Sequence, residues 1–333
     1  MKGLIQTGLM VALSVTFMVN SNTATAQSSS KDPVVVGVNV WVGWMPWWIV
    51  EEKNFLEKHN ANAKLRFFGV QSESQNALAA GHLDAASLAS GDVLSVNANS
   101  VPTSIVNLTN VSAGADMLIT RSVDKVKDLK GQRIGVEIGG VSHFFLVKLL
   151  EKHGMSEEDV RLTNMSAANA GSAFIAGSID AVVTWEPHAT KALDEGGEIL
   201  ASSKDTPNAV VDVLTVRDDV LSKRREDMKK VLAAWFEALD FVETNPEKAF
   251  AIMAEGADVS VSQMKSMWSG VYMYKRSDVI KTMGTPNEQG PYYETINDMS
   301  EFMVSQDLIP RPVDPTEMID ASLVRELGEK GVQ

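Results

Sequence analysis

ALAAGHLDA at residues 77–85 and AFIAGSIDA at residues 173–181 are two copies of one pattern. Each has Ala, two apolar residues, Ala-Gly, two further residues and Asp-Ala. Glycine commonly follows the last turn of a helix because it adopts the left-handed conformation without strain. Each copy therefore predicts a helix that ends at the glycine and a strand that follows at once. The alternative is that the match is a coincidence, since helices often end in Ala-Gly. A second match argues against it, because VGV at residues 36–38 precedes the first copy and IGV at residues 134–136 precedes the second.

Apolar runs alternate with helical patterns around both copies, which predicts an α/β fold with parallel sheets. The expected strands are 34–38, 63–70 and 83–89, and the expected helices are 46–58 and 74–80. The chain from Arg224 onward is expected to be mostly helical, with helices at 228–243, 246–254, 261–273 and 293–304. Two short apolar strands, 117–120 and 212–216, are expected to form two crossings between two lobes.

The N-terminus has the pattern of a secretory signal peptide. Lys2 gives a positive start, residues 9–19 are apolar apart from two hydroxyl residues, and Ala24 and Ala26 stand where a signal peptidase cleaves. A membrane anchor is the alternative, but the apolar run is shorter than the roughly 20 residues that span a bilayer. We expect cleavage near Ala26 and Gln27, and therefore a periplasmic protein.

Composition narrows the classes of function. The 333 residues carry a formal net charge of −13, which disfavours nucleic acid and anionic lipid as partners. There is no cysteine, which excludes disulfides, thiolate metal sites and a lipid-modified N-terminal cysteine. The five histidines lack metal-ligand spacing, and no nucleophile elbow, phosphate loop or dinucleotide motif is present. We therefore expect no enzyme activity, no metal and no cofactor.

Ligands of open α/β sheets bind beyond the carboxyl ends of the strands, where helix N-termini offer free N–H groups. After the first predicted strand, Trp41 and Trp44 are expected to form an aromatic wall, or alternatively to pack the next helix on its sheet. Gln71, Ser90 and Asp92 follow the next two strands and are expected to bind ligand, although helix capping explains such residues equally well.

In the second unit, Gly140, Ser142 and His143 open a predicted helix, where a glycine lets the backbone approach a ligand. A lone histidine is more often structural. Trp185 and Glu186 end the last strand of this unit, and an indole beside a carboxylate suits an amine or guanidine-like group. The alternative for Glu186 is that it caps the helix that begins after Pro187.

Several stretches together resemble the nitrate/sulfonate/taurine (NitT/TauT) family of ABC-transporter solute-binding proteins. They are WVGWMP at 41–46, AAGHLDA at 79–85, VKDLKGQRIGV at 126–136 and AGSIDA at 176–181, followed by WEP at 185–187. The resemblance implies a type II periplasmic-binding-protein fold, in which two α/β lobes with mainly parallel sheets are joined by two crossings and hold the ligand between them. We expect the signal peptide at 1–26, the first lobe at 27–117 and 217–333, and the second lobe at 118–216.

The resemblance also implies partners: a small solute, and a membrane permease driven by a cytoplasmic ATPase, with the binding protein itself a monomer. The acidic residue beside Trp185 favours a taurine-like zwitterion or a guanidine- or urea-like compound over nitrate and simple alkanesulfonates. Two rival functions stay open. One is an enzyme that resembles the thiamine-pyrimidine synthase of the same fold, which carries a cysteine-rich motif absent here. The other is a sensor subunit that presents ligand to a receptor.

Overall fold

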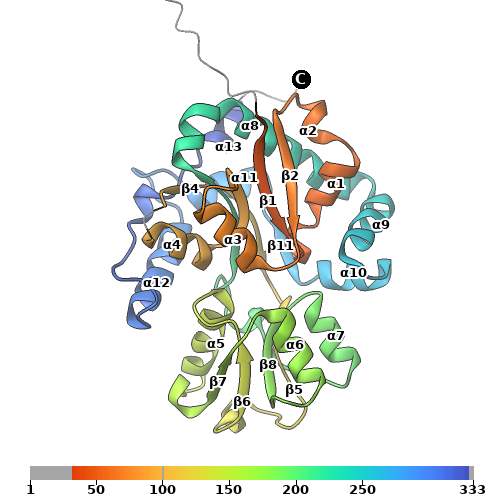
Figure 1. Ribbon diagram of the computed structural model, residues 1–333, viewed down its shortest axis with the longest axis vertical. Coiled ribbons are helices and arrows are strands. Elements are labelled where there is room, and N and C mark those ends of the chain that lie inside the picture. Colours follow the sequence, from red (N-terminus) through yellow and green to blue (C-terminus); the bar gives the residue numbers. More distant parts are fainter. Residues whose placement is uncertain (1–31, 100, 330–333) are drawn as a thin grey trace, which may run out of the picture. The chain divides into compact units, whose positions relative to one another are not determined.

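The computed structural model describes residues 32–99 and 101–329, so the predicted signal peptide lies outside the described residues. Two separate β-sheets organise the chain (Figure 1). The first sheet has the spatial order β11 (Val271–Met273), β4 (Thr103–Ser112), β10 (Val211–Arg217), β3 (Ala85–Ala89), β1 (Val34–Asn39) and β2 (Ala63–Phe68). The second has the order β7 (Arg161–Asn164), β6 (Arg133–Val136), β8 (Ala181–Trp185), β5 (Asp116–Thr120) and β9 (Glu198–Ser202). We call each sheet with the helices on it a lobe.

Helices cover both sheets, as expected for an α/β fold. In the first lobe they are α1 (Pro46–Glu52), α2 (Phe55–Lys58), α3 (Gln71–Ala79), α4 (Ser90–Ala98), α8 (Asp218–Thr244), α9 (Pro246–Ala257), α10 (Val261–Trp268), α11 (Arg276–Met283), α12 (Tyr292–Ser305) and α13 (Ser322–Glu329). In the second lobe they are α5 (Val141–Lys152), α6 (Ala167–Ile175) and α7 (His188–Asp194). Short 3₁₀ turns are η1 (Val42–Trp44), η2 (Val126–Leu129), η3 (Glu157–Asp159), η4 (Ser203–Asp205) and η5 (Pro315–Glu317).

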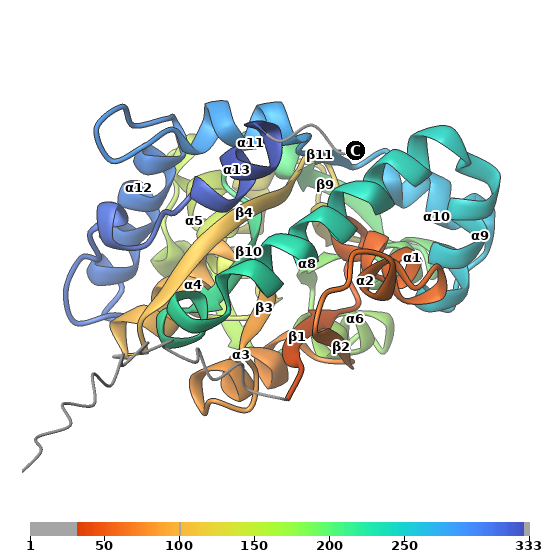
Figure 2. The same ribbon diagram turned by 90° about the horizontal axis from the view of Figure 1, so that it is seen from above.

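The C-terminal helices return to the first sheet, as the sequence predicted. The long helix α8 contacts β1, β4 and β10 and runs between α1 and α13 (Figure 2). Trp235 on its buried face packs against Trp47 of α1, with 4.8 Å between the ring centroids. Across the described residues, no helix combines the length and the apolar character that a membrane span requires.

The internal repeat is confirmed by the structure. Helix α3 leads through Gly81 into β3, and helix α6 leads through Gly177 into β8. The two glycines have φ angles of 75° and 73°, in the left-handed region that glycine occupies without strain. Each α–β unit therefore ends its helix by the same device, and each directs the following strand into the centre of its own sheet.

The second match, between Gly37 of β1 and Gly135 of β6, has a packing cause. A methyl group on Gly37 would lie 2.5 Å from Cδ1 of Leu83, and one on Gly135 would lie 2.5 Å from Cδ1 of Ile179. The side chains that enter these spaces occupy equivalent positions of the two repeats. Glycine thus leaves room for Leu83 and Ile179, and a larger residue in either first strand would force the end of that neighbouring side chain to shift.

The sheets are mixed rather than mainly parallel. Strands β1, β2 and β3 are parallel, as are β6, β7 and β8, but β10 runs antiparallel to β3 and β4, and β5 runs antiparallel to β8 and β9. Both β5 and β10 begin at the carboxyl ends of the parallel strands, because Asp116 pairs with Trp185 and Asp212 with Ala89. A chain that enters a sheet from that end must run against the parallel strands.

The same pairing corrects the predicted crossings. Residues 117–120 lie in β5 and residues 212–216 lie in β10, so these strands are inside the sheets. The chain crosses at 113–115 and returns at 203–210, and Ser203 Oγ ties the two crossings by accepting from the Gly114 N–H at 2.7 Å. Strand β10 belongs to the first sheet, which differs from the predicted lobe limit at 216.

One predicted helix is shorter than expected. Helix α10 ends at Trp268, and β11 begins at Val271, whereas a helix through residue 273 was predicted. The carbonyl of Gly270 accepts from the N–H groups of Ala113 at 2.8 Å and Ala115 at 3.1 Å, which pulls the chain out of the helix and onto the first crossing. The sequence pattern of residues 261–273 does not indicate these hydrogen bonds to residues 113 and 115.

Candidate ligand-binding site

A cavity of about 260 Å³ lies at the carboxyl ends of strands from both sheets. Its wall comes from the start of α3, the first turns of α4, the β6–α5 loop, the end of β8 and the segment after α12. The residues that line it are Gln71, Ser72, Gln75, Asp92, Ser95, Glu137, Ile138, Gly139, Gly140, Val141, Ser142, Trp185 and Leu308. A hollow of about 410 Å³ between α5 and α12 is larger but lies away from these strand ends.

The helix N-termini of the two lobes approach each other at this cavity. A methyl group on Gly91 of α4 would lie 3.6 Å from the backbone nitrogen of Val141 in α5. One on Gly140, the residue before α5, would lie 3.5 Å from Asp92 Oδ1. The starts of α3, α4 and α5 thus face one space, and their free N–H groups give it a partial positive charge.

The side chains of the cavity wall are acidic and polar. The Gln71 amide donates to Asp92 Oδ2, and the Gln75 amide donates to the Asp92 carbonyl at 3.4 Å. Burial, together with the charge of nearby Glu137, raises the pKa of Asp92 to about 7 against the opposing hydrogen bond from Gln71. Burial also raises the pKa of Glu137. Among the described residues, no lysine or arginine lines the cavity.

Five of the predicted site residues line this cavity: Gln71, Asp92, Gly140, Ser142 and Trp185. The Ser142 hydroxyl is buried and has no hydrogen-bond partner within the described part of the chain. Trp185, at the end of β8, is 9% exposed. The carboxyl ends of the parallel strands thus bring together residues that come from two lobes and lie far apart in the sequence.

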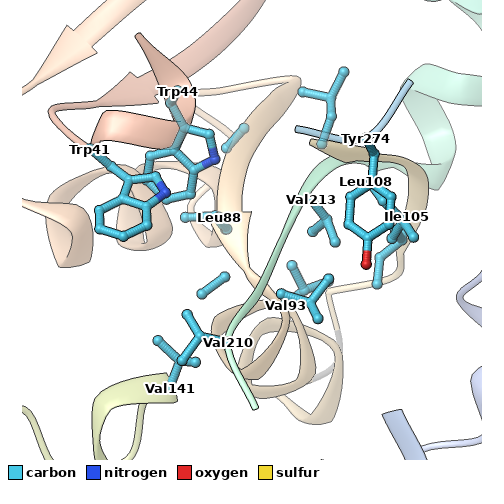
Figure 3. Close-up of a cluster of buried hydrophobic side chains, with 14 of the residues drawn as sticks. Trp41, Trp44, Leu88, Val93, Ile105, Leu108, Val141, Val210, Val213 and Tyr274 are labelled. Atoms are coloured by element: carbon cyan, nitrogen blue, oxygen red, sulfur yellow. The ribbon is translucent and has the colours of Figure 1, made fainter. Parts of the chain in front are cut away.

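Trp41 and Trp44 lie in a buried cluster that reaches the second lobe. Trp41 is 4% exposed, and its Nε1 donates to Asn110 Oδ1 at 3.2 Å. Figure 3 shows both indoles in one cluster with Leu88, while Val141 of α5 lies at its lower edge. Neither tryptophan is among the residues that line the cavity, so they form the packed layer behind the strand ends.

Two other predicted residues have internal partners. The Ser90 hydroxyl donates to the Val211 carbonyl at 2.8 Å and lies 2.7 Å from the Tyr292 hydroxyl. The His143 ring bonds to Glu157 through Nε2 and accepts from the Gly139 N–H at 3.4 Å. Both side chains are buried and neither lines the cavity, because their polar atoms point into their own lobes.

Glu186 caps a helix, which is the alternative to ligand contact that the sequence left open. Its Oε2 accepts from the Thr190 N–H at 3.0 Å, so the carboxylate caps the start of α7. Burial raises the pKa of Glu186, and the bond from Thr190 opposes that rise. Glu186 does not line the cavity, whereas its neighbour Trp185 does.

Sequence reasoning missed two buried acids at the crossings, Asp116 and Asp212. They are 2% and 3% exposed, and each has a carboxylate oxygen, Oδ2, without a hydrogen-bond partner in the described residues. Burial raises the pKa of Asp116 to about 7 and that of Asp212 well above its usual range. A single aspartate at the start of an apolar strand was the only signal in the sequence.

Within residues 32–99 and 101–329, no group of three potential ligand side chains is placed to hold a metal ion.

The two sheets, the two crossings and the cavity between helix N-termini define the two-lobed periplasmic-binding-protein fold, as predicted. The crystal structure of the periplasmic aliphatic sulphonate binding protein from Escherichia coli has the same fold, with a TM-score of 0.73, 19% identity and coverage of 87% of this chain and 92% of that chain. A desulfurization enzyme also shares it, with a TM-score of 0.65, 12% identity and coverage of 90% and 100%. The fold alone therefore does not separate binding from catalysis.

The chain belongs to the NMT1-like family, whose model matches residues 27–255. A Brucella abortus protein named as a binding protein is 26% identical over an alignment of 277 positions, which covers 81% of this chain and 84% of that protein. The taurine-binding periplasmic protein of Escherichia coli K12 is 24% identical over an alignment of 270 positions, which covers 78% of this chain and 82% of that protein. These relatives agree with the resemblance to the nitrate/sulfonate/taurine family.

Proposed function

We propose that this protein is the extracytoplasmic solute-binding component of an ABC importer. The observation that carries the proposal is the cavity of about 260 Å³, whose wall comes from both lobes. A solute in that cavity contacts both lobes only when they are close, so it favours the closed arrangement by its differential affinity. The membrane permease, with its cytoplasmic ATPase, then recognises the closed surface. The periplasmic names of relatives support an export role for the N-terminal segment.

The domain limits follow from sheet membership. We propose a cleaved signal peptide at 1–26, a first lobe formed by residues up to 112 and from 211 onward, and a second lobe at 116–202. The short crossings at 113–115 and 203–210 then act as the hinge. The approach of Gly91 to Val141 supports the view that the described arrangement corresponds to the closed state.

The chemistry of the cavity favours a solute with two different ends. The starts of α3, α4 and α5 suit an anionic or strongly polar group. Asp92, Glu137 and the Trp185 indole suit a positive or amide-like nitrogen. A taurine-like zwitterion, or a guanidine- or urea-like compound, meets these conditions, and the taurine-binding relative supports the first. Nitrate and simple alkanesulfonates rank lower, because the wall offers them no lysine or arginine.

The proposed function is tested by binding and by uptake. Taurine, hypotaurine, guanidinium, urea, nitrate and ethanesulfonate are screened by thermal shift, since a bound solute raises the melting temperature. We expect at least one of taurine, hypotaurine, guanidinium and urea to bind without being chemically converted. We also expect deletion of the gene to abolish uptake of that compound. Uptake that continues at a fixed permease level would instead indicate a sensor, and chemical conversion of the compound by the purified protein would indicate an enzyme.

A further inference from the structure

The cavity has an apolar side to which the proposed function assigns no part of the solute. Ile138 and Leu308 line the cavity, and both are hydrophobic side chains that are only partly buried against the core. Ile138 comes from the loop between β6 and α5 in the second lobe, and Leu308 comes from the segment after α12 in the first lobe. Hydrocarbon that covers such a surface gains about fourfold in affinity for each methylene group that leaves water. A solute without hydrocarbon gains nothing from these two side chains.

Two adjacent glycines place this apolar side directly beside the acidic side. A methyl group on Gly139 would lie 3.5 Å from Cδ2 of Leu308, whereas one on Gly140 would lie 3.5 Å from Oδ1 of Asp92. Neighbouring Cα atoms are about 3.8 Å apart. The first lobe therefore presents a hydrocarbon group and a carboxylate to consecutive residues of the second lobe. A small solute fits both when its nitrogen carries a hydrocarbon arm.

The loop that carries Ile138 is held in place by side chains behind it. The Ile138 N–H donates to Asn164 Oδ1 at 3.1 Å, and the Gly139 N–H donates to His143 Nδ1 at 3.4 Å. His143 is held in turn by Glu157 through Nε2. Gly139 has a φ angle of 94°, which a residue with a side chain adopts only with strain. This side of the cavity therefore has a fixed shape, and His143 positions the loop from behind it.

The end of α12 holds Leu308 against that loop. The Leu308 N–H donates to the Met303 carbonyl at 2.9 Å, and Asp307 has a φ angle of 55°, so the chain turns sharply after the helix. Phe302 of the same helix packs on the His143 ring of the second lobe, with 5.5 Å between the ring centroids. Helix α12 thus contacts the histidine that positions the loop. Leu308 is therefore a fixed boundary of the cavity, and its size limits what lies beside it.

We propose that Ile138 and Leu308 form a subsite for a short hydrocarbon arm next to the nitrogen end of the solute, and that Leu308 determines how long this arm can be. The inference rests on the proposed function and narrows its solute class. It selects an alkylguanidine or an aminoalkanesulfonate of limited chain length over guanidinium, urea and nitrate, which have no hydrocarbon to cover the two side chains.

The test measures affinity along two homologous series by calorimetry. One series runs from guanidinium through methylguanidinium to butylguanidinium, and the other runs from taurine through 3-aminopropanesulfonate to 4-aminobutanesulfonate. We expect the wild-type chain to bind members of at least one series. Within that series the affinity should reach a maximum and then fall at least tenfold by the longest member, because the arm meets Leu308. In the guanidinium series it should first rise by about fourfold for each methylene group.

Two substitutions change the space for the arm in opposite directions. Leu308→Ala should move the maximum to a longer arm, with at least a fivefold gain of the longest member relative to the shortest. Leu308→Phe should move it to a shorter arm, with at least a fivefold loss by the same measure. Leu239→Ala is the matched control, because Leu239 is a partly buried leucine of α8 in the same lobe and does not line the cavity. This control should keep the wild-type order of affinities.

The outcomes separate the subsite from the proposed function. An order of affinities that stays the same in both Leu308 variants would overturn the role of Leu308 and leave the solute-binding function standing. Guanidinium that binds as tightly as every alkylguanidinium would overturn the hydrocarbon subsite. Thermal unfolding checks that each variant is folded, and Leu308→Val replaces Leu308→Ala if the latter is not, with a smaller shift in the same direction. If the wild-type chain binds no member of either series, the proposed solute class and the subsite both fail.

Discussion

Replacement of Asp116 by asparagine should stabilise the empty protein, and the gain should grow with pH. Burial raises the pKa of Asp116 from 3.8 to about 7, whereas the same carboxyl in the unfolded chain keeps the lower value. Between these pH values the folded chain holds a proton that the unfolded chain has lost. Stability therefore falls as pH rises through this window and is level above it. At about 1.4 kcal/mol for each pH unit, the full loss is about 4 kcal/mol.

The assay is urea unfolding of the wild-type chain, Asp116→Asn and the exposed control Asp124→Asn at pH 5 and pH 8. At pH 5 only the start of the loss has occurred, and at pH 8 it is complete. The difference in unfolding free energy between Asp116→Asn and wild type should therefore grow by about 2–3 kcal/mol between the two pH values. The control should shift by less than about 0.5 kcal/mol, as surface changes do.

The test depends on how the difference in unfolding free energy between Asp116→Asn and wild type changes with pH, and not on its value at one pH. The asparagine amide introduces buried donors that can cost about 1–3 kcal/mol if they find no acceptor, but this cost does not depend on pH. Asp212 and Glu186 titrate in both proteins, and removal of the Asp116 charge lowers the electrostatic cost at Asp212, which acts in the same direction. A difference that stays constant from pH 5 to pH 8 would refute the reasoning, because Asp116 would then titrate alike in the folded and unfolded chains.

Three further predictions follow from the packing of the site and the repeat. Trp185→Ala should weaken solute binding at least tenfold while circular dichroism shows a folded chain, since the indole lines the cavity at the end of β8. Glu186→Gln should change the affinity less than threefold by calorimetry, because the side chain caps α7 at the Thr190 N–H; a tenfold loss would return it to the site. Gly135→Val should lower the unfolding free energy by about 1–3 kcal/mol, the usual cost of overpacking, since its Cβ would lie 2.5 Å from Ile179 Cδ1. Equal stability of this variant in urea would contradict the packing argument.

Local patterns in the sequence predicted those features that depend on local physics. A glycine that ends a helix before a strand is written in adjacent residues, so Gly81 and Gly177 revealed both the repeat and the paired lobes. The expectation that ligands bind beyond the carboxyl ends of the strands then selected loops that meet at one cavity. It did so because a parallel sheet brings its carboxyl ends to one edge whatever the distance along the chain.

The features that the sequence did not reveal depend on which strands become neighbours. Strand pairing places Asp116 beside Trp185, and it places Asp212 beside Ala89 at the end of β3. Nothing near either aspartate in the sequence indicates these pairings. Glu186 illustrates the converse, since its position beside Trp185 predicted ligand contact and helix capping equally well, and only the direction of its side chain distinguishes them.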